Sequence, residues 1–187
     1  MITVVDHDPR WVDRFEALRT EYAAAFAAAR VPVVAIEHVG STSVEGLAAK
    51  PVIDSDIVIA AEDVVAASAV LVGLGFVPRG ERGIPQRWAF YQPERLADTH
   101  TYVVVNGSLS HRNHPAVREL LRKDGALRRE YREVKKQVAM TAVDVDQYVQ
   151  GKNDILQRIL AVAGLSEAER ESIHSANRNP PTRPPTE

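Results

Sequence analysis

Two aspartates stand close together in an otherwise apolar stretch of the chain. Asp54 and Asp56 lie within the run VIDSDIVIA, whose β-branched, apolar composition is typical of a buried strand. Side chains alternate between the two faces of a strand, so both carboxylates are expected on one face. Burying two unpaired carboxylates side by side is costly, and a divalent cation would offset that cost. Oxygen ligands favour Mg2+ or Mn2+, and Mg2+ commonly completes its shell with substrate phosphates.

A turn of small residues, GSTS, lies upstream of this acidic strand. Gly40 allows close backbone approach, and the amides and hydroxyls of Ser41, Thr42 and Ser43 can surround an anion. Lys50, just before the strand, adds a positive charge. Each motif alone has an ordinary explanation, as a capped turn or as an edge strand that faces solvent. Turn and acidic strand together predict a metal site beside a phosphate-binding turn.

The composition excludes several classes of partner. The 187 residues include 23 Lys and Arg against 25 Asp and Glu, so the formal net charge is -2 and no basic field is expected to hold nucleic acid. There are no cysteines, which excludes disulfides and thiolate metal sites. The sequence has no basic-then-apolar leader and no run of roughly 18 apolar residues. We therefore expect a cytoplasmic protein with neither a nucleic-acid nor a membrane partner.

The elements that must position these residues indicate an α+β fold, with a small mixed sheet flanked by helices. Apolar residues at three- and four-residue steps predict a first helix that ends near residue 29. Strands are expected at 33–39, 52–60, 76–77, 87–91 and 99–105, and helices at 61–74, 115–123, 126–140 and 145–163.

This pattern predicts one domain over residues 1–164, with its C-terminal helices starting near residue 110. Residues 165–187 are expected to form a short helix or a disordered Pro-rich tail. The many charges between residues 111 and 136 are interpreted as a solvated helical face.

The sequence resembles the GrpB family in three places. The pattern DP.W...F matches residues 8–15, the long pattern IEHVGSTSV.GL.AKP.ID.D matches residues 36–56, and Y...K matches residues 148–152. The likeness covers about residues 5–164. More broadly, a glycine–serine turn followed by D-x-D resembles the nucleotidyltransferase superfamily, which includes polymerase beta and the aminoglycoside adenylyltransferases.

The resemblance implies that the turn holds NTP phosphates and that Asp54 and Asp56 hold the metal. The superfamily usually adds a third carboxylate from a later strand, but the strand THTYVVV contains no acid and Asp98 only precedes it. GrpB relatives tend to carry His-x-His on this strand, matched here by His100 and Tyr102. His100 is therefore a candidate metal ligand, general base or phosphate donor.

Two cations and three further histidines complete the candidate set. The family tends to show arginine at Arg87, which would clamp a phosphate or an acidic substrate unless it is an ordinary surface arginine. The resemblance also makes Lys152 a triphosphate contact. His38 either orients the turn or touches substrate, whereas His111 and His114 are expected to cap a helix or face solvent.

These features predict a metal-dependent nucleotidyltransferase that uses an NTP, with ATP the first choice, and an unknown small-molecule acceptor. The absence of a third carboxylate keeps open a non-catalytic protein that binds a nucleotide or a phosphometabolite. A phosphohydrolase ranks last, because the sequence lacks the usual His-Asp clusters.

Overall fold

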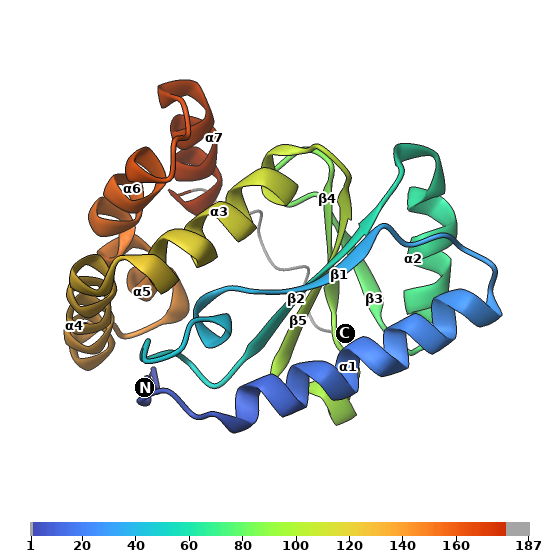
Figure 1. The fold of residues 1–187 in the computed structure, drawn as a ribbon, viewed down its shortest axis with the longest axis horizontal. Helices are drawn as coiled ribbons and strands as arrows, with labels where there is room; N and C mark the ends of the chain where they lie inside the picture. The colour runs from blue at the N-terminus through green and yellow to red at the C-terminus, as the bar shows by residue number, and fades with distance from the viewer. Residues whose placement is uncertain (1, 179–187) are drawn as a thin grey trace.

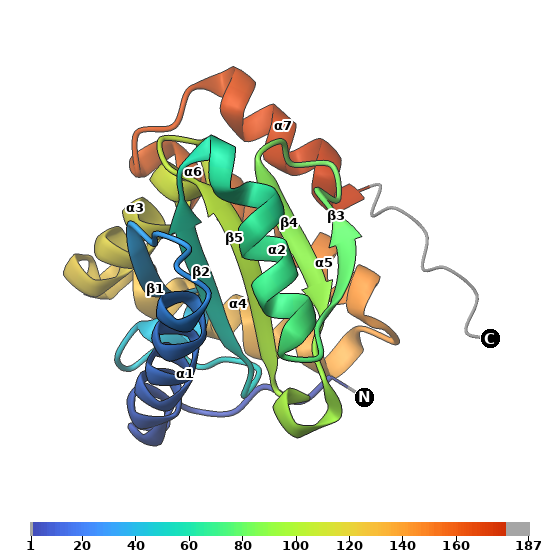
Figure 2. The same ribbon diagram turned by 90° about the vertical axis from the view of Figure 1, so that its right-hand side faces the viewer.

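Residues 2–178, the part of the chain described by this computed structural model, form a five-stranded mixed sheet with helices on both faces (Figure 1, Figure 2). The strand order is β1-β2-β5-β4-β3; β2 and β5 run parallel and the other neighbours antiparallel. The strands are β1 (Ala35–Val39), β2 (Ile53–Ile59), β3 (Val77–Gly80), β4 (Arg87–Tyr91) and β5 (Thr99–Val105). The predicted α+β class is confirmed.

The helices fall into two groups on opposite sides of the sheet. Figure 2 shows α1 and α2 in front of the sheet and the later helices behind it. The helices are α1 (Arg10–Ala28), α2 (Val64–Gly73), α3 (Leu109–Lys123), α4 (Gly125–Thr141), α5 (Val145–Gly151), α6 (Asn153–Val162) and α7 (Glu167–Arg178). Every helix among the described residues is too short or too polar to cross a bilayer.

The face under α1 and α2 is the main apolar core. The predicted stripe of α1 is entirely buried, and it packs against alternate residues of β2: Trp11, Phe15, Leu18, Tyr22 and Phe26 meet Ile53, Ile57 and Ile59. Burying a large apolar side chain stabilises the fold by roughly 1.5–3 kcal/mol. This packing fixes which face of β2 is inward, so the intervening aspartates must point to the other face.

Strand register then brings distant residues together on that other face. In the antiparallel pair, Val39 lies opposite Asp54, so the turn that follows β1 begins beside this carboxylate. In the parallel pair, Asp54 lies opposite His100 and Asp56 opposite Tyr102. Helices α3 to α7 lie on this side of the sheet (Figure 1, Figure 2).

Several helix boundaries differ from those predicted. Helix α3 begins at Leu109, where Ser108 Oγ accepts a hydrogen bond from His111 N at 3.3 Å, and Pro115 lies inside the helix instead of starting it. The helix predicted at 145–163 is two helices, α5 and α6, that meet at Lys152. Residues 61–63 form a 3-10 turn before α2.

The C-terminal segment is partly a helix. Helix α7 spans Glu167–Arg178, so this part of residues 165–187 takes one of the two expected forms, a short helix. The remainder of the predicted tail, residues 179–187, lies outside the described residues.

Candidate functional site

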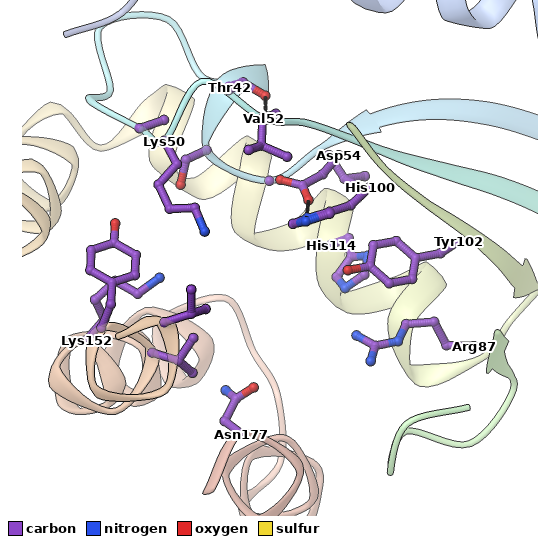
Figure 3. Close-up of a pocket in the computed structure, with 17 residues that line it drawn as sticks. Thr42, Lys50, Val52, Asp54, Arg87, His100, Tyr102, His114, Lys152 and Asn177 are labelled. Atoms are coloured by element: carbon purple, nitrogen blue, oxygen red, sulfur yellow. Dashed lines mark hydrogen bonds and ion pairs between the residues drawn. The ribbon is translucent and has the colours of Figure 1, made fainter. Parts of the chain in front are cut away.

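A cavity of about 390 Å3 opens between the sheet and the C-terminal helices (Figure 3). It brings together eight of the ten predicted site residues, from three strands, two loops and the junction of α5 and α6: Gly40, Ser41, Thr42, Lys50, Asp54, Arg87, His100 and Lys152. The other two, Ser43 and Asp56, are not among the described residues that line it. Tyr102, His114, Tyr148 and Asn177 also line the wall.

Gly40 allows the turn to lie directly against a carboxylate. Its backbone has φ 70° and ψ -170°, a combination that essentially only glycine adopts. A Cβ at this position would overlap Asp54 Oδ2. Any other residue would therefore push the turn and the carboxylate apart.

Hydrogen bonds within the turn fix its shape. Ser43 Oγ donates to Gly40 O at 2.6 Å, so this hydroxyl closes the turn and does not face the cavity. Thr42 Oγ1 donates to Val52 O at 3.2 Å and lies 3.0 Å from His38 Nε2, whose N–H therefore donates to Thr42. Burial lowers the pKa of His38 to about 4, so its ring is neutral at pH 7. His38 thus orients the turn and does not line the cavity.

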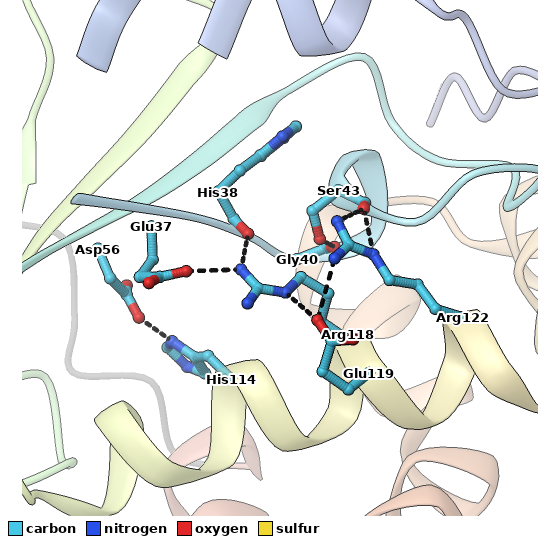
Figure 4. A network of polar contacts seen from close by, with 9 residues as sticks. All are labelled: Glu37, His38, Gly40, Ser43, Asp56, His114, Arg118, Glu119 and Arg122. Atoms are coloured by element: carbon cyan, nitrogen blue, oxygen red, sulfur yellow. Dashed lines mark hydrogen bonds and ion pairs between the residues drawn. The ribbon is translucent and has the colours of Figure 1, made fainter. Parts of the chain in front are cut away.

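Two arginines of α3 hold the turn from outside (Figure 4). Arg118 Nη1 donates to Glu37 Oε2 at 2.8 Å and to His38 O at 2.7 Å. Arg122 donates through two nitrogens to Ser43 O, at 2.8 and 3.2 Å. The interpretation of the charges between residues 111 and 136 as a solvated face was therefore wrong for Arg118, whose side chain is 14% exposed. The four-residue spacing of the two arginines, which places both on one face of α3, was the signal available in the sequence.

The two aspartates share a face of β2, as predicted, but differ in exposure. The Asp54 side chain is 28% exposed, and its Oδ1 lies 3.0 Å from His100 Nδ1. The Asp56 side chain is 2% exposed, and its Oδ2 lies 2.6 Å from His114 Nδ1. His114 lines the cavity and separates it from Asp56, so the expectation that His114 caps a helix or faces solvent was wrong. His111 makes only a local contact here: its Nδ1 accepts a hydrogen bond from Gly107 N, just before α3.

The donor atoms fit a metal that is completed by its substrate. Within residues 2–178, no three His, Cys, Asp or Glu side chains are grouped so that they could hold a metal ion. Asp98 supplies no third ligand, since its side chain is 70% exposed and lies 3.9 Å from Arg14. Asp56 Oδ1, however, is buried without a hydrogen-bond partner among the described residues. Two carboxylates with an open oxygen suit Mg2+ or Mn2+ that takes its other ligands from phosphate and water.

Three cations, Lys50, Arg87 and Lys152, line the same cavity as Asp54 (Figure 3). Lys152 Nζ lies 4.2 Å, and Lys50 Nζ 5.9 Å, from the centre of the Tyr148 ring. Burial and the neighbouring Lys50 charge lower the pKa of Lys152 to about 8. Neither lysine nor Arg87 forms an ion pair within the described part of the chain. Such a group of unpaired cations is complementary to a polyanion.

A buried lysine lies behind this group and was missed in the sequence. Lys135 is 1% exposed, its Nζ lies 4.5 Å from the Tyr131 ring centre, and it has no hydrogen-bond partner in the described structure. Burial, aided by the Lys152 charge, lowers the pKa of Lys135 well below its ordinary value. The signal was its spacing, because Lys135 shares the buried stripe of α4 with Leu127, Tyr131 and Ala139.

Residues 1–162 match the sequence profile described as GrpB protein. This chain belongs to the GrpB family. The UPF0157 protein YqkA of Bacillus subtilis is 28% identical over 155 residues, which are 82% of this chain but only 44% of YqkA. A UPF0157 protein of Streptomyces coelicolor is 32% identical over 169 residues, which cover 88% of this chain and 86% of that protein.

The fold also matches a solved structure of this family. The crystal structure of the conserved protein GrpB from Enterococcus faecalis superposes with a TM-score of 0.75 and 28% identity, covering 86% of this chain and 96% of that chain. A chain of the GLD-2/RNP-8 complex matches with a TM-score of 0.43 and 16% identity, a likeness too low to indicate function. The cavity of this GrpB-family chain, and not the likeness to other solved structures, is the basis for a functional proposal.

Proposed function

We propose that this GrpB-family protein transfers a nucleoside monophosphate from an NTP, with ATP the first candidate, to a hydroxyl or amine of a small molecule. The observation that carries the proposal is the close approach of Gly40 to Asp54, which sets the turn of small residues directly against a carboxylate. Lys50, Arg87 and Lys152, which form no ion pair in the described part of the chain, add positive charge around the same cavity. A metal-bridged polyphosphate satisfies both sets of groups at once.

The reaction balances with the groups present. The acceptor oxygen or nitrogen forms a bond to the α-phosphorus, the bond from that phosphorus to the bridging oxygen breaks, and pyrophosphate leaves. Asp54 and Asp56 would hold Mg2+ or Mn2+, which neutralises charge on the transferred phosphate. The turn and the lysines bind the outer phosphates. Nδ1 of His100 faces Asp54, so its Nε2 is available to take the acceptor proton.

A second candidate is a protein that binds a nucleotide or phosphometabolite without turnover. The specific observation in its favour is that no group of three or more His, Cys, Asp or Glu side chains among residues 2–178 is arranged to hold a metal ion. Such a protein would retain the turn and the cations, and would bind its ligand without releasing pyrophosphate. Turnover, not affinity, separates the two candidates.

Calorimetric titration of ATP and of GTP, each with and without Mg2+, tests the proposal. Wild type is expected to bind at least one nucleotide more tightly with Mg2+, and Asp54→Asn is expected to lose that metal-dependent gain. Asp98→Asn is the matched control, because it makes the same change at an exposed acid outside the cavity. Equal absence of binding in wild type and Asp54→Asn would overturn the proposal.

Pyrophosphate release then separates enzyme from binding protein. Wild type with MgATP is incubated with a panel of alcohols and amines, and released pyrophosphate is measured. Release that depends on an acceptor and is lost in Asp54→Asn supports transfer. Tight MgATP binding with no release across the panel favours the second candidate.

A further inference from the structure

A second cavity lies beside the first and has a different chemical character. Its volume is about 220 Å3, and it shares the turn, Arg87, His114 and Asn177 with the larger cavity. Its remaining wall comes from helices α3, α4, α6 and α7 and nearby loops and is mostly apolar, apart from Asn113, Arg118 and Tyr131; the apolar residues include Val44, Ile84, Val117, Leu121, Leu160 and Ile173. The two cavities therefore share a wall that includes residues assigned to phosphate binding.

The size of this second cavity suits one small ring or branched alkyl group. A cavity of about 150 Å3 lined by apolar side chains can bind benzene. A space of 220 Å3 next to a charged site therefore accommodates an aromatic ring with a short side chain that extends toward the larger cavity. Arg118 and Tyr131 also line the cavity, so it is the apolar part of the wall that favours an apolar group over a charged or sugar-like one.

One polar atom in this apolar wall lacks a partner. Asn113 is 8% exposed, and its Oδ1 is buried without a hydrogen bond in the described structure. Buried amide oxygens are nearly always paired in folded proteins. Asn113 lines this cavity, and the next residue, His114, lines both cavities and contacts Asp56. A ligand with an O–H or N–H group would satisfy it.

Helix α7 supplies part of this wall from beyond the family match, which ends at residue 162. Its first turn is held by Arg112, whose Nη2 lies 2.6 Å from Glu169 Oε1, and Ser166 forms three hydrogen bonds with the same glutamate. The Ser166 backbone N–H and Arg112 lower the pKa of Glu169 to about 2. The helix is therefore anchored, and Ile173 and Asn177 form a fixed boundary of the cavity.

From these observations we infer that the 220 Å3 cavity binds the apolar group of the acceptor, an alcohol or amine, and that an O–H or N–H of the acceptor other than the one that reacts donates to Asn113. This inference rests on the proposed nucleotidyl transfer. Helix α7 then limits the size of the acceptors that this chain accepts. Nucleotide and acceptor occupy neighbouring spaces and bind at the same time.

The test uses 2-phenylethanol as the probe and ligand-observed NMR on the full chain, with and without MgATP. Wild type is expected to bind the alcohol saturably, and MgATP is expected not to displace it. Val117→Phe fills the cavity from the partly buried face of α3 and is expected to weaken binding by about tenfold or more. Val162→Phe is the matched control, since Val162 is 58% exposed and lies outside the cavity.

A second variant tests the hydrogen bond and does not depend on filling the cavity. Wild type is expected to prefer 2-phenylethanol over its methyl ether by about threefold to tenfold, the range for one neutral hydrogen bond, and Asn113→Leu is expected to lose that preference. Thermal unfolding checks that each variant is folded.

Three results would overturn the inference. They are no saturable alcohol binding to wild type, displacement of the alcohol by MgATP, and equal weakening in Val117→Phe and Val162→Phe. Displacement would make this cavity the nucleoside site instead. Failure of the proposed function is recognised separately, because wild type would then bind no MgATP or would bind it without releasing pyrophosphate, and the acceptor role would be overturned with it whatever the alcohol does.

Discussion

The two faces of the sheet bury different kinds of side chain. Under α1 and α2 the interior is almost wholly apolar, and the Tyr22 hydroxyl finds a partner in Thr101 at 2.8 Å, although Ser55 Oγ has none among the described residues. Under α3 to α7, the unpaired buried atoms include a carboxylate oxygen of Asp56 and the amine of Lys135.

A buried carboxylate oxygen or amine without a partner costs more than an unpaired hydroxyl, so the second face is less stable as it stands, although the other Asp56 oxygen contacts His114. A metal with a polyphosphate in the larger cavity would supply a partner for the aspartate side of this face. The comparison therefore indicates that one face provides the stability of the fold, while the other uses part of that stability to keep a site ready for its ligand.

The largest expected effect is the difference in stability between substitutions on the two faces of β2. Ile57→Ala removes a fully buried side chain from the α1 side of β2 and is expected to lower the free energy of unfolding by about 2–5 kcal/mol. Asp54→Asn, on the other side of β2, is expected to change it by less than about 1 kcal/mol, since its ion pair is partly exposed. Urea denaturation measures both. Equal losses would contradict the division of roles.

A substitution in the turn sharpens the comparison by damaging the site and not the core. Gly40→Ala adds a Cβ that overlaps Asp54 Oδ2, and is expected to weaken MgATP binding by about 100-fold, or about 2.7 kcal/mol. Gly80→Ala is the matched control, because Gly80 has a nearly equal φ of 71° and no described atom within 4 Å of an added Cβ. Both variants bear backbone strain of roughly 1–3 kcal/mol. If Gly40→Ala kept the MgATP affinity of the wild type, the close approach of Gly40 to Asp54 would not be needed for binding.

The buried amine of Lys135 offers a test of the destabilised face. Lys135→Met keeps the volume and removes the unpaired amine, so the ligand-free protein is expected to gain about 1–3 kcal/mol of stability. Lys136→Met, one residue along, alters a partly exposed lysine paired with Asp6 and is expected to change stability by less than about 0.5 kcal/mol. Thermal and urea unfolding at pH 7 compare them. A less stable Lys135→Met would mean that this amine already has a partner.

The smallest expected effect is a dependence of binding on pH. Lys152 has a pKa of about 8 without ligand, and a bound triphosphate raises that pKa by stabilising the charged amine. Affinity is therefore full below about pH 8 and falls as the pH rises toward the pKa in the complex, by at most about tenfold per pH unit. Calorimetry between pH 7 and 9 should also detect proton uptake on binding.

Lys152→Met provides the control for this pH effect. The variant is expected to bind MgATP more weakly at pH 7 and with a flatter pH profile. An unchanged profile in Lys152→Met would place the titrating group elsewhere.

The sequence predicts the core face better than the site face, for physical reasons. A stripe on one helix and alternation on one strand are local patterns, so residues such as Trp11 and Ile57 could be assigned as buried from spacing alone. The strands 87–91 and 99–105 coincide with β4 and β5 for the same reason.

The site face depends on pairings between distant parts of the chain. Asp54 meets His100 only through parallel register, and Asp56 meets His114 only because α3 packs across β2. From the sequence alone, a charged residue such as Arg118 is assigned to the solvated surface, because the carbonyl group that it binds belongs to a distant part of the chain. Asn177 comes from a segment whose composition favours disorder, and its place at the cavity depends on the packing of α7.

The most direct test of the central claim is a crystal structure of the protein soaked with Mn2+ and a non-hydrolysable ATP analogue, with anomalous scattering used to locate the manganese. The account predicts manganese bound by Asp54 and Asp56 and by a phosphate oxygen, with the outer phosphates at Gly40 and Ser41 and within reach of Lys152. Manganese away from both aspartates, or a triphosphate bound remote from the turn, would contradict it.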